Sequence, residues 1–210
     1  MSDPTVLAAG ALGSVEAAVE VLRAGGIVAL PTETVYGLAV LPHAGPLARL
    51  LTAKRRPHEK GIALAVDSIA QVERLADLPA AARRLAERFW PGPLTLVVPA
   101  RSDQARELPD PLLGTTGDLG FRLPHHPVPR QLAAQLGPLA LTSANVSGGP
   151  DVRTVDELLI ALGDAPSLVL DGGPVLGGVA STVVAIDAAG VVTVLRAGAL
   201  DPDEVLAALT

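Results

Sequence analysis

Apolar residues recur along the chain with two different periods. An apolar residue at every third or fourth position, the period of an amphipathic helix, predicts helices at residues 14–24, 46–54, 68–76, 79–89 and 128–135. Short apolar runs bounded by Gly, Pro or polar residues predict strands at residues 27–30, 62–66, 95–98, 119–123, 139–142 and 167–170. Strands at 181–186 and 191–195 flank a turn at 187–190 and predict a hairpin. Helices that alternate with strands in this way predict an α/β domain with a mixed sheet.

Polar residues mark where several of these helices begin. Ser68 and Gln71 have the spacing of a capping box, in which each side chain bonds to the other's backbone. Thr154 and Glu157 cap a further helix in the same way. Asp201 is followed by Pro and two acidic residues, which is typical of the start of a last helix.

The chain shows no internal repeat and no low-complexity segment. We therefore expect a single domain over residues 1–210, with its core at about residues 12–200. Residues 99–118 form the longest stretch without clear periodicity, and we interpret them as a mobile loop.

The composition excludes several classes of protein. Hydrophobic residues make up 49% of the chain and aromatic residues only 2%, so the core must consist of aliphatic side chains. The chain has no cysteine, which excludes disulfides, thiolate metal sites and a cysteine nucleophile. The N-terminal segment has acidic residues before its apolar stretch, unlike a signal peptide, and no apolar run reaches the roughly 18 residues of a membrane span. We expect a cytoplasmic protein without a membrane segment.

Positive charge is concentrated in one short segment of an acidic chain. The net charge is −6, yet the only two lysines, Lys54 and Lys60, lie within seven residues of each other, beside Arg55 and Arg56. Basic side chains at the end of a helix can simply stabilise its dipole. Alternatively, the point charge of lysine and the planar fork of arginine can together bind a triphosphate. The residues themselves leave both interpretations open.

Small polar side chains follow two of the predicted strands. Residues 32–34 are Thr-Glu-Thr, and residues 142–147 are followed by two glycines, Gly148 and Gly149, that would let a phosphate or a carboxylate approach closely. Hydroxyls at such places often only cap a turn. Arg122 lies in a predicted strand between apolar residues, so it needs an anionic partner if it is buried. That partner is either a ligand or a structural carboxylate such as Asp118.

Several familiar kinds of site are absent from the sequence. There is no P-loop motif and no glycine-rich dinucleotide fingerprint. His43, His58, His125 and His126 do not have the spacing of a zinc site, and we predict no metal site. Trp90 and the Pro-Gly-Pro that follows it are interpreted as a rigid structural turn.

Six stretches, spread in order over nearly the whole chain, match the motifs of one family. They are residues 30–38 (Leu-Pro-Thr-Glu-Thr-Val-Tyr-Gly-Leu), 54–57 (Lys-Arg-Arg-Pro), 88–95 (Arg-Phe-Trp-Pro-Gly-Pro-Leu-Thr), 121–127 (Phe-Arg-Leu-Pro-His-His-Pro), 142–148 (Thr-Ser-Ala-Asn-Val-Ser-Gly) and 181–183 (Ser-Thr-Val) with Arg196. Together they resemble the YrdC-like family of threonylcarbamoyl-AMP synthases. Each motif is modest alone, but six in the same order are highly specific.

The resemblance implies a fold and a set of site residues. The implied fold is a single α/β domain whose twisted mixed sheet curls around a positively lined concave site and is flanked by helices. The residues implied to bind ATP are Lys54, Arg56, Lys60, Asn145, Arg153 and Arg196, of which Lys54 and Arg56 are also implied in catalysis. The residues implied to bind threonine and the bicarbonate-derived group are Thr32, Thr34, Arg122, Ser143 and Ser181.

The resemblance also implies an activity. It is the synthesis of L-threonylcarbamoyladenylate from L-threonine, bicarbonate and ATP, with release of pyrophosphate, which feeds the modification of adenosine 37 in tRNA. ATP is then a substrate that carries Mg²⁺ with it. The implied partners are downstream tRNA-modification proteins, and a contact with RNA itself is compatible with the resemblance.

The chain also departs from the family pattern. Lys60-Gly61 stands where many members have Asn-Pro, and Ala65 replaces a histidine that contacts threonine in members with Lys-Gly. The chain ends before the extra C-terminal domain of longer members, so it resembles the short form. Two alternatives keep the fold: a non-catalytic RNA-binding module, and a paralogue that forms a carbamoyl-adenylate.

Overall fold

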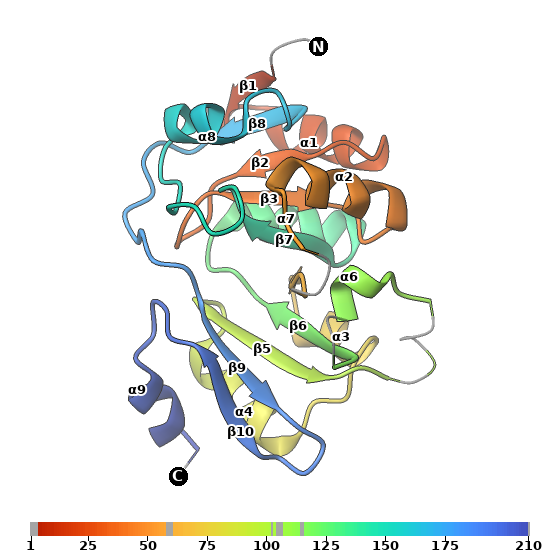
Figure 1. Cartoon of the computed structure of the whole chain (residues 1–210), viewed down its shortest axis with the longest axis vertical. Coiled ribbons are helices and arrows are strands. Elements are labelled where there is room, and N and C mark those ends of the chain that lie inside the picture. Colours follow the sequence, from red (N-terminus) through yellow and green to blue (C-terminus); the bar gives the residue numbers. More distant parts are fainter. Residues whose placement is uncertain (1–3, 58–60, 102, 104–106, 114–115, 210) are drawn as a thin grey trace.

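The computed structural model describes residues 4–57, 61–101, 103, 107–113 and 116–209. Within them, one mixed ten-stranded sheet runs through the molecule in the order β1-β8-β2-β3-β7-β4-β6-β5-β9-β10. The strands are β1 (Thr5–Ala8), β2 (Val28–Leu30), β3 (Gly37–Val40), β4 (Leu64–Ala65), β5 (Leu94–Pro99), β6 (Asp118–Arg122), β7 (Leu139–Ser143), β8 (Leu168–Asp171), β9 (Thr182–Ile186) and β10 (Val192–Arg196). Figure 1 shows β1 at the top and β10 at the bottom, with the strands changing direction between them.

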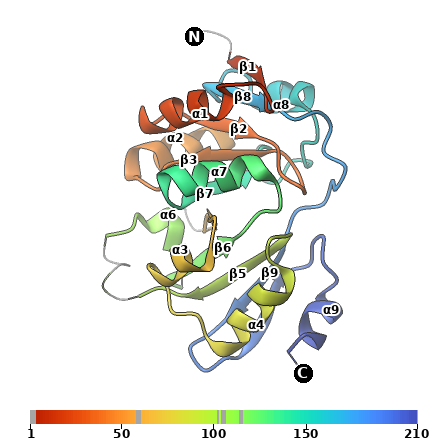
Figure 2. The ribbon, with the colours of Figure 1, turned by 180° about the vertical axis from the view of Figure 1, so that it is seen from behind.

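The upper half of the sheet, which consists of β1, β8, β2, β3 and β7, is covered by helices on both faces. Helices α1 (Ser14–Arg23) and α7 (Pro127–Leu136) lie on the face seen in Figure 2. There Leu22 and Leu132 pack with Leu30 of β2 in one apolar cluster. Helices α2 (Ala44–Lys54) and α8 (Val155–Leu162) lie on the side that faces the viewer in Figure 1, where their leucines pack with Ala29 of β2. Because adjacent residues of a strand point to opposite faces, β2 is buried on both sides.

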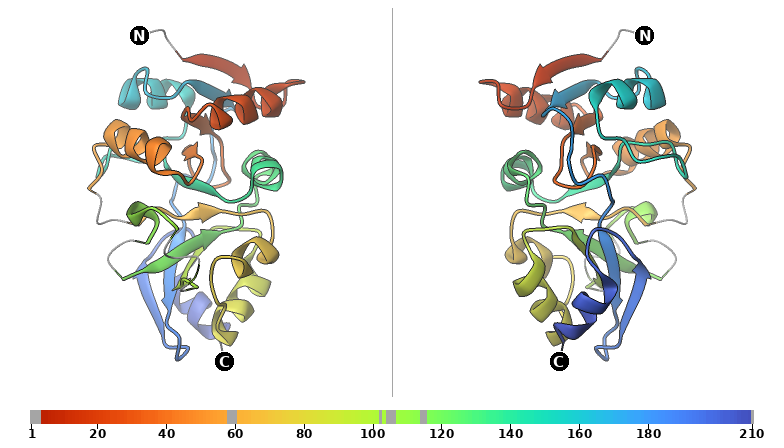
Figure 3. Two further views of the ribbon diagram at one scale, coloured as in Figure 1. Left: turned by 90° about the vertical axis from the view of Figure 1, so that its right-hand side faces the viewer. Right: turned by 90° about the vertical axis from the view of Figure 1, so that its left-hand side faces the viewer.

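The lower half of the sheet, which consists of β4, β6, β5, β9 and β10, carries the other helices of the described residues. They are α3 (Ile69–Glu73), α4 (Ala80–Phe89), α6 (Asp110–Leu113) and α9 (Pro202–Ala207). Leu85 of α4, Val205 of α9 and Leu112 of α6 belong to one core cluster with Phe121 of β6. The two side views of Figure 3 show α4 and α9 beside the lower strands and the upper helices stacked above them. No helix among the described residues has the length and apolar character that crossing a membrane requires.

The predicted fold class is confirmed, and so is the hairpin, because β9 and β10 pair in antiparallel orientation. Among the residues that the structure describes, three elements were not predicted: β1, β3 and α6. Since α6 occupies Asp110–Leu113, the stretch at 99–118 is not a loop throughout, whereas its mobility stays a prediction.

The caps of two predicted helices turn out differently. The hydroxyl of Thr154 accepts a hydrogen bond from the Glu157 amide at 3.2 Å, as expected. The capping box of Ser68 and Gln71 is wrong, because Ser68 donates instead to the carboxylate of Asp67 at 2.8 Å. The side chain of Gln71 accepts from the Asp67 amide at 3.2 Å and donates to a carbonyl of α7, so it ties α3 to a neighbouring helix.

Candidate functional site

A cleft of about 490 Å³ lies where the two halves of the sheet meet. Its lining comes from strands of both halves and includes apolar side chains such as Val97, Leu141 and Leu195. Seven of the predicted site residues line it: Thr32, Thr34, Arg56, Arg122, Ser143, Ser181 and Arg196. Residues up to 164 positions apart in the sequence (196 minus 32) therefore share one hollow.

The turn between β2 and β3 is held by a threonine and presents a second one. Thr32 Oγ1 donates to the Val35 carbonyl at 2.6 Å and accepts from the amides of Thr34 and Val35 at 3.1 and 3.2 Å. The two threonine hydroxyls lie 2.9 Å apart, and both residues are buried. Thr32 thus caps the turn, and the turn fixes Thr34 at the cleft.

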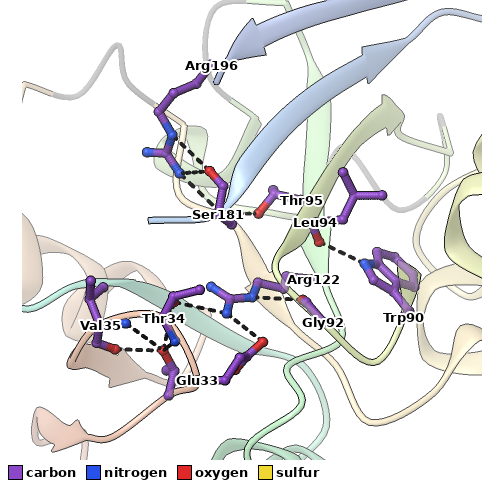
Figure 4. Close-up of polar contacts among 11 residues, drawn as sticks. Glu33, Thr34, Val35, Trp90, Gly92, Leu94, Thr95, Arg122, Ser181 and Arg196 are labelled. Atoms are coloured by element: carbon purple, nitrogen blue, oxygen red, sulfur yellow. Dashed lines mark hydrogen bonds and ion pairs between the residues drawn. The ribbon is translucent and has the colours of Figure 1, made fainter. Parts of the chain in front are cut away.

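Arg122 connects this turn to the lower half of the sheet (Figure 4). Its guanidinium donates to Thr34 Oγ1 at 3.0 Å and to the Gly92 carbonyl at 3.3 Å, and forms an ion pair with Glu33 at 2.8 Å. Burial alone would raise the pKa of Glu33, but the charge and hydrogen bond of Arg122 outweigh it and hold the pKa below its usual value. The structural carboxylate that faces Arg122 is therefore Glu33, not the suggested Asp118, which lines the cleft.

Arg196 holds Ser181 at the opposite wall (Figure 4). Its Nε and Nη2 atoms donate to the Ser181 carbonyl at 3.1 and 2.8 Å, and Nη2 also donates to Ser181 Oγ at 3.2 Å. The hydroxyl of Thr95, on β5, lies 2.8 Å from that same Oγ. Thr95 lines the cleft, although it is not among the predicted site residues.

The three arginines that line the cleft are close enough for their charges to act on one another. Burial, followed by the charge of Arg196, lowers the pKa of Arg56. Burial also lowers the pKa of Arg196, with Asp151 opposing the shift and Arg122 adding to it. Arg56 further donates to the Gly61 carbonyl at 2.9 Å. A polyanion placed among these groups would relieve their repulsion and receive charge-assisted hydrogen bonds.

Lys54 is buried behind the cleft and holds the turn that follows β7. Its Nζ atom donates to the carbonyls of Ser143 and Asn145 and lies 3.3 Å from Asn145 Oδ1. Burial, followed by the charge of Arg56, lowers the pKa of Lys54 to about 8, and Asp151 opposes this shift. The ammonium has three hydrogens and meets three acceptors, so it fixes the shape of this turn.

Among the described residues, three that were predicted to bind the nucleotide do not line the cleft: Lys54, Asn145 and Arg153. Asn145 lies beside a second hollow, where its amide donates to the Gly149 carbonyl at 2.6 Å and its Oδ1 accepts from Ser143 Oγ at 2.6 Å. Arg153 donates weakly to the Gly178 carbonyl, at 3.5 Å. Lys60 lies outside the described residues. In the part of the chain that the structure describes, no three His, Asp or Glu side chains gather as a metal site would require.

Comparisons with known proteins point in one direction. A model of the Sua5/YciO/YrdC family, described as "Telomere recombination", matches residues 20–198. A Coxiella burnetii protein named threonylcarbamoyl-AMP synthase is 37% identical over 163 residues, covering 76% of this chain and 85% of that protein. The Bacillus subtilis protein of the same name is 33% identical over 211 residues, covering 99% of this chain and 57% of its own length.

A solved structure shares the fold over nearly the whole chain. The crystal structure of Sua5 from Pyrococcus abyssi, complexed with L-threonine, has a TM-score of 0.83 and 34% sequence identity. The match covers 92% of this chain but 56% of that one, so this chain spans little more than half of the archaeal protein.

Proposed function

The chain belongs to the Sua5/YciO/YrdC family, and we infer that it is a threonylcarbamoyl-AMP synthase. It makes L-threonylcarbamoyladenylate from ATP, bicarbonate and L-threonine and releases pyrophosphate, and the product feeds the threonylcarbamoyl modification of adenosine 37 in tRNA. The observation that carries this inference is the cleft, where Arg56, Arg122 and Arg196 lie together with the hydroxyls of Thr34 and Ser181.

The arginines of the cleft are suited to the phosphates of ATP. Arg56 and Arg196 would bind them, since each offers a fork of donors to paired oxygens. Lys54 would act on the nucleotide through the turn that it holds, and Asn145 belongs to that turn. Lys60 and Arg153 would complete the nucleotide subsite, an assignment that rests on the sequence resemblance.

The hydroxyls of the cleft are suited to the amino acid. Thr34, Ser143 and Ser181 would contact threonine, while Thr32 keeps the turn of Thr34 in shape. Arg122 would bind the threonine carboxylate or the bicarbonate-derived group, because it already bonds to the Thr34 hydroxyl. A site that hydrogen-bonds a substrate hydroxyl discriminates strongly against an analogue that lacks it.

The reaction needs positioning and charge more than a nucleophile from the protein. The amine of threonine captures the carbon of bicarbonate as a carbamate, with loss of water. A carbamate oxygen then attacks the α-phosphorus of ATP, the bond from that phosphorus to the bridging oxygen breaks, and pyrophosphate leaves. Arg56 and Arg196 would stabilise the negative charge that develops on the phosphates. Mg²⁺ would enter with ATP, whose phosphate oxygens are its preferred ligands.

The partners of this chain follow from the chemistry of its product. A mixed anhydride hydrolyses in water, so a tRNA-modification protein must take it onward quickly, and we propose that this happens in the cytoplasm. We also propose that the chain contacts RNA directly.

The decisive experiment supplies ATP and bicarbonate with threonine, serine or valine, and measures pyrophosphate and the adenylate product. We expect release with threonine that far exceeds release with the other two. A Lys54→Ala, Arg56→Ala double variant should lose most of this release while remaining folded. Undiminished release in that variant would contradict the assignment, whereas RNA binding without threonine-dependent ATP consumption would favour a non-catalytic module.

A further inference from the structure

Thr95 lies between the two walls of the cleft. Its strand, β5, pairs with β6, which carries Arg122, and on the other side with β9, which directly follows Ser181. Thr95 and Ser181 are each only 5% exposed, and both line the cleft. The hydroxyl at this place in the apolar strand Leu94–Pro99 is not needed to fill space, because a valine has the same shape.

The hydrogen bonds between Thr95, Ser181 and Arg196 use only one of the two hydroxyl hydrogens of Thr95 and Ser181. The two hydroxyls lie 2.8 Å apart, so one of them donates to the other. Ser181 Oγ also accepts a hydrogen bond from Arg196 at 3.2 Å. This bond uses no hydroxyl hydrogen, because the guanidinium is the donor. Among the described residues, neither hydroxyl meets a further acceptor. Two hydroxyls carry two hydrogens, and whichever way the mutual bond runs, one hydrogen has no protein partner.

An oxygen of a bound substrate can supply the missing acceptor. Leaving a buried donor without an acceptor is unfavourable, so this hydrogen favours a ligand oxygen in the cleft. We propose that Thr95 and Ser181 act as a hydroxyl pair that donates one hydrogen bond to an oxygen of the amino-acid substrate. In this pair, Thr95 positions Ser181 and determines which of the two hydroxyls donates to the other. This inference rests on the proposed function, since it assigns the pair to the threonine subsite.

Replacing Thr95 by valine tests the pair, because valine keeps the shape and removes the hydroxyl. In Thr95→Val we expect the KM for threonine to rise about 3- to 10-fold, the range that corresponds to one lost neutral hydrogen bond, with the KM for ATP unchanged. Thr95→Ser should restore the threonine KM, because it returns the hydroxyl. Measuring the same variant with L-2-aminobutyrate, which is threonine without its hydroxyl, identifies the acceptor. An equal rise in KM for both substrates indicates an acceptor at the carboxyl end, and a rise for threonine alone indicates the side-chain hydroxyl.

A matched control comes from β10, the strand at the edge of the sheet. Thr193 on β10 is exposed and does not line the cleft, so Thr193→Val should leave both KM values unchanged. An unaltered threonine KM in Thr95→Val, an equal rise in both KM values, or failure of Thr95→Ser to restore binding would each overturn the proposal. Threonine binding measured by calorimetry reports on the pair even if no pyrophosphate is released, so failure of the pair and failure of the proposed function can be told apart.

Discussion

Glu33 and Arg122 form the best-buried ion pair among the described residues, with side chains 19% and 11% exposed. Replacing Glu33 by Gln keeps the shape but leaves the guanidinium of Arg122 without its counter-charge. We expect Glu33→Gln to lower the free energy of unfolding by about 1–3 kcal/mol at pH 7, measured by urea denaturation. It should also raise the KM for threonine, because Arg122 no longer has a fixed position.

An exposed ion pair provides the control for this change. Arg83 and Glu73 form a pair whose side chains are 45% and 44% exposed, so solvent screens it. Glu73→Gln should therefore cost less than about 1 kcal/mol and leave the threonine KM unchanged. Equal costs for the two substitutions would mean that Glu33 does not neutralise Arg122 in the folded protein.

Lys54 gives the protein a distinctive response to alkaline pH. Its pKa in the folded state is lowered to about 8, whereas an unfolded lysine titrates near its ordinary value of 10.5. As pH rises through about 8, the ammonium loses a hydrogen that the turn after β7 uses, so activity should fall. Between about 8 and 10 the unfolded chain binds more protons, so unfolding free energy should rise with pH, by at most about 1.4 kcal/mol per unit.

This opposite movement of activity and stability can be measured by pyrophosphate release and urea unfolding from pH 7 to 9.5. Lys54→Met has no proton to lose and should remove the upward slope in stability. Stopping near pH 9.5 keeps Tyr36, whose pKa burial raises above 10, out of the window. A flat stability curve for the natural sequence would show that Lys54 keeps its ordinary pKa.

The sequence predicted much of the cleft and left out what depends on distant partners. Arg122 could be singled out because an arginine between apolar residues needs an anion, but its partner Glu33 is 89 positions away (122 minus 33). In the sequence, Thr95 is only a single hydroxyl in an apolar strand. The proposed role of that hydroxyl depends on its contact with Ser181, which the fold creates. Likewise, the charge of Lys54 pointed to phosphate, whereas its burial against backbone carbonyls follows from the fold.

Helix ends could be located from the sequence, but not every cap could be identified. Thr154 and Ser68 stand at equivalent positions, yet only Thr154 accepts a bond from the backbone of its helix. Thr154→Ala should thus cost about 1 kcal/mol of unfolding free energy, the usual loss for a capping hydroxyl. Ser68→Ala should cost clearly less, because Ser68 donates only to the side chain of Asp67. Equal losses in thermal or urea unfolding would contradict this distinction.

The elements that escaped prediction are short ones that need a neighbour. Strand β3 has four residues, Gly37–Val40, all buried, so it shows no alternation of polar and apolar positions. Strand β1 lies at the edge of the sheet and is defined by its pairing with β8, about 160 residues later. Helix α6 is a single turn, too short for a helical period. Long helices with an apolar stripe, such as α1 and α4, were predicted because their signal is local.

At the scale of the whole molecule, one of the segments that join the two halves of the sheet runs beside the cleft. Residues 172–181 run from β8 in the upper half to β9 in the lower half (Figure 1). On the way, the amide of Gly178 donates to the Thr34 carbonyl at 2.7 Å. A Cβ atom on Gly177 would lie 2.4 Å from the Glu33 carbonyl oxygen, closer than real contacts allow. The connector and the threonine turn can therefore touch only because residue 177 is glycine.

Gly177→Ala should consequently separate these two segments and disturb both walls of the cleft together. We expect a loss of about 1–3 kcal/mol in unfolding free energy, as for other overpacked contacts, and a rise in the KM for threonine. Gly45→Ala is the control, because nothing lies within 4 Å of its added Cβ atom. If Gly177→Ala kept full stability and an unchanged threonine KM, the connector would not be what holds the Thr34 turn. In that case the hydrogen bonds of Thr32 within the turn, together with the contacts of Arg122 with Thr34 and Glu33, would be enough to set the position of the turn.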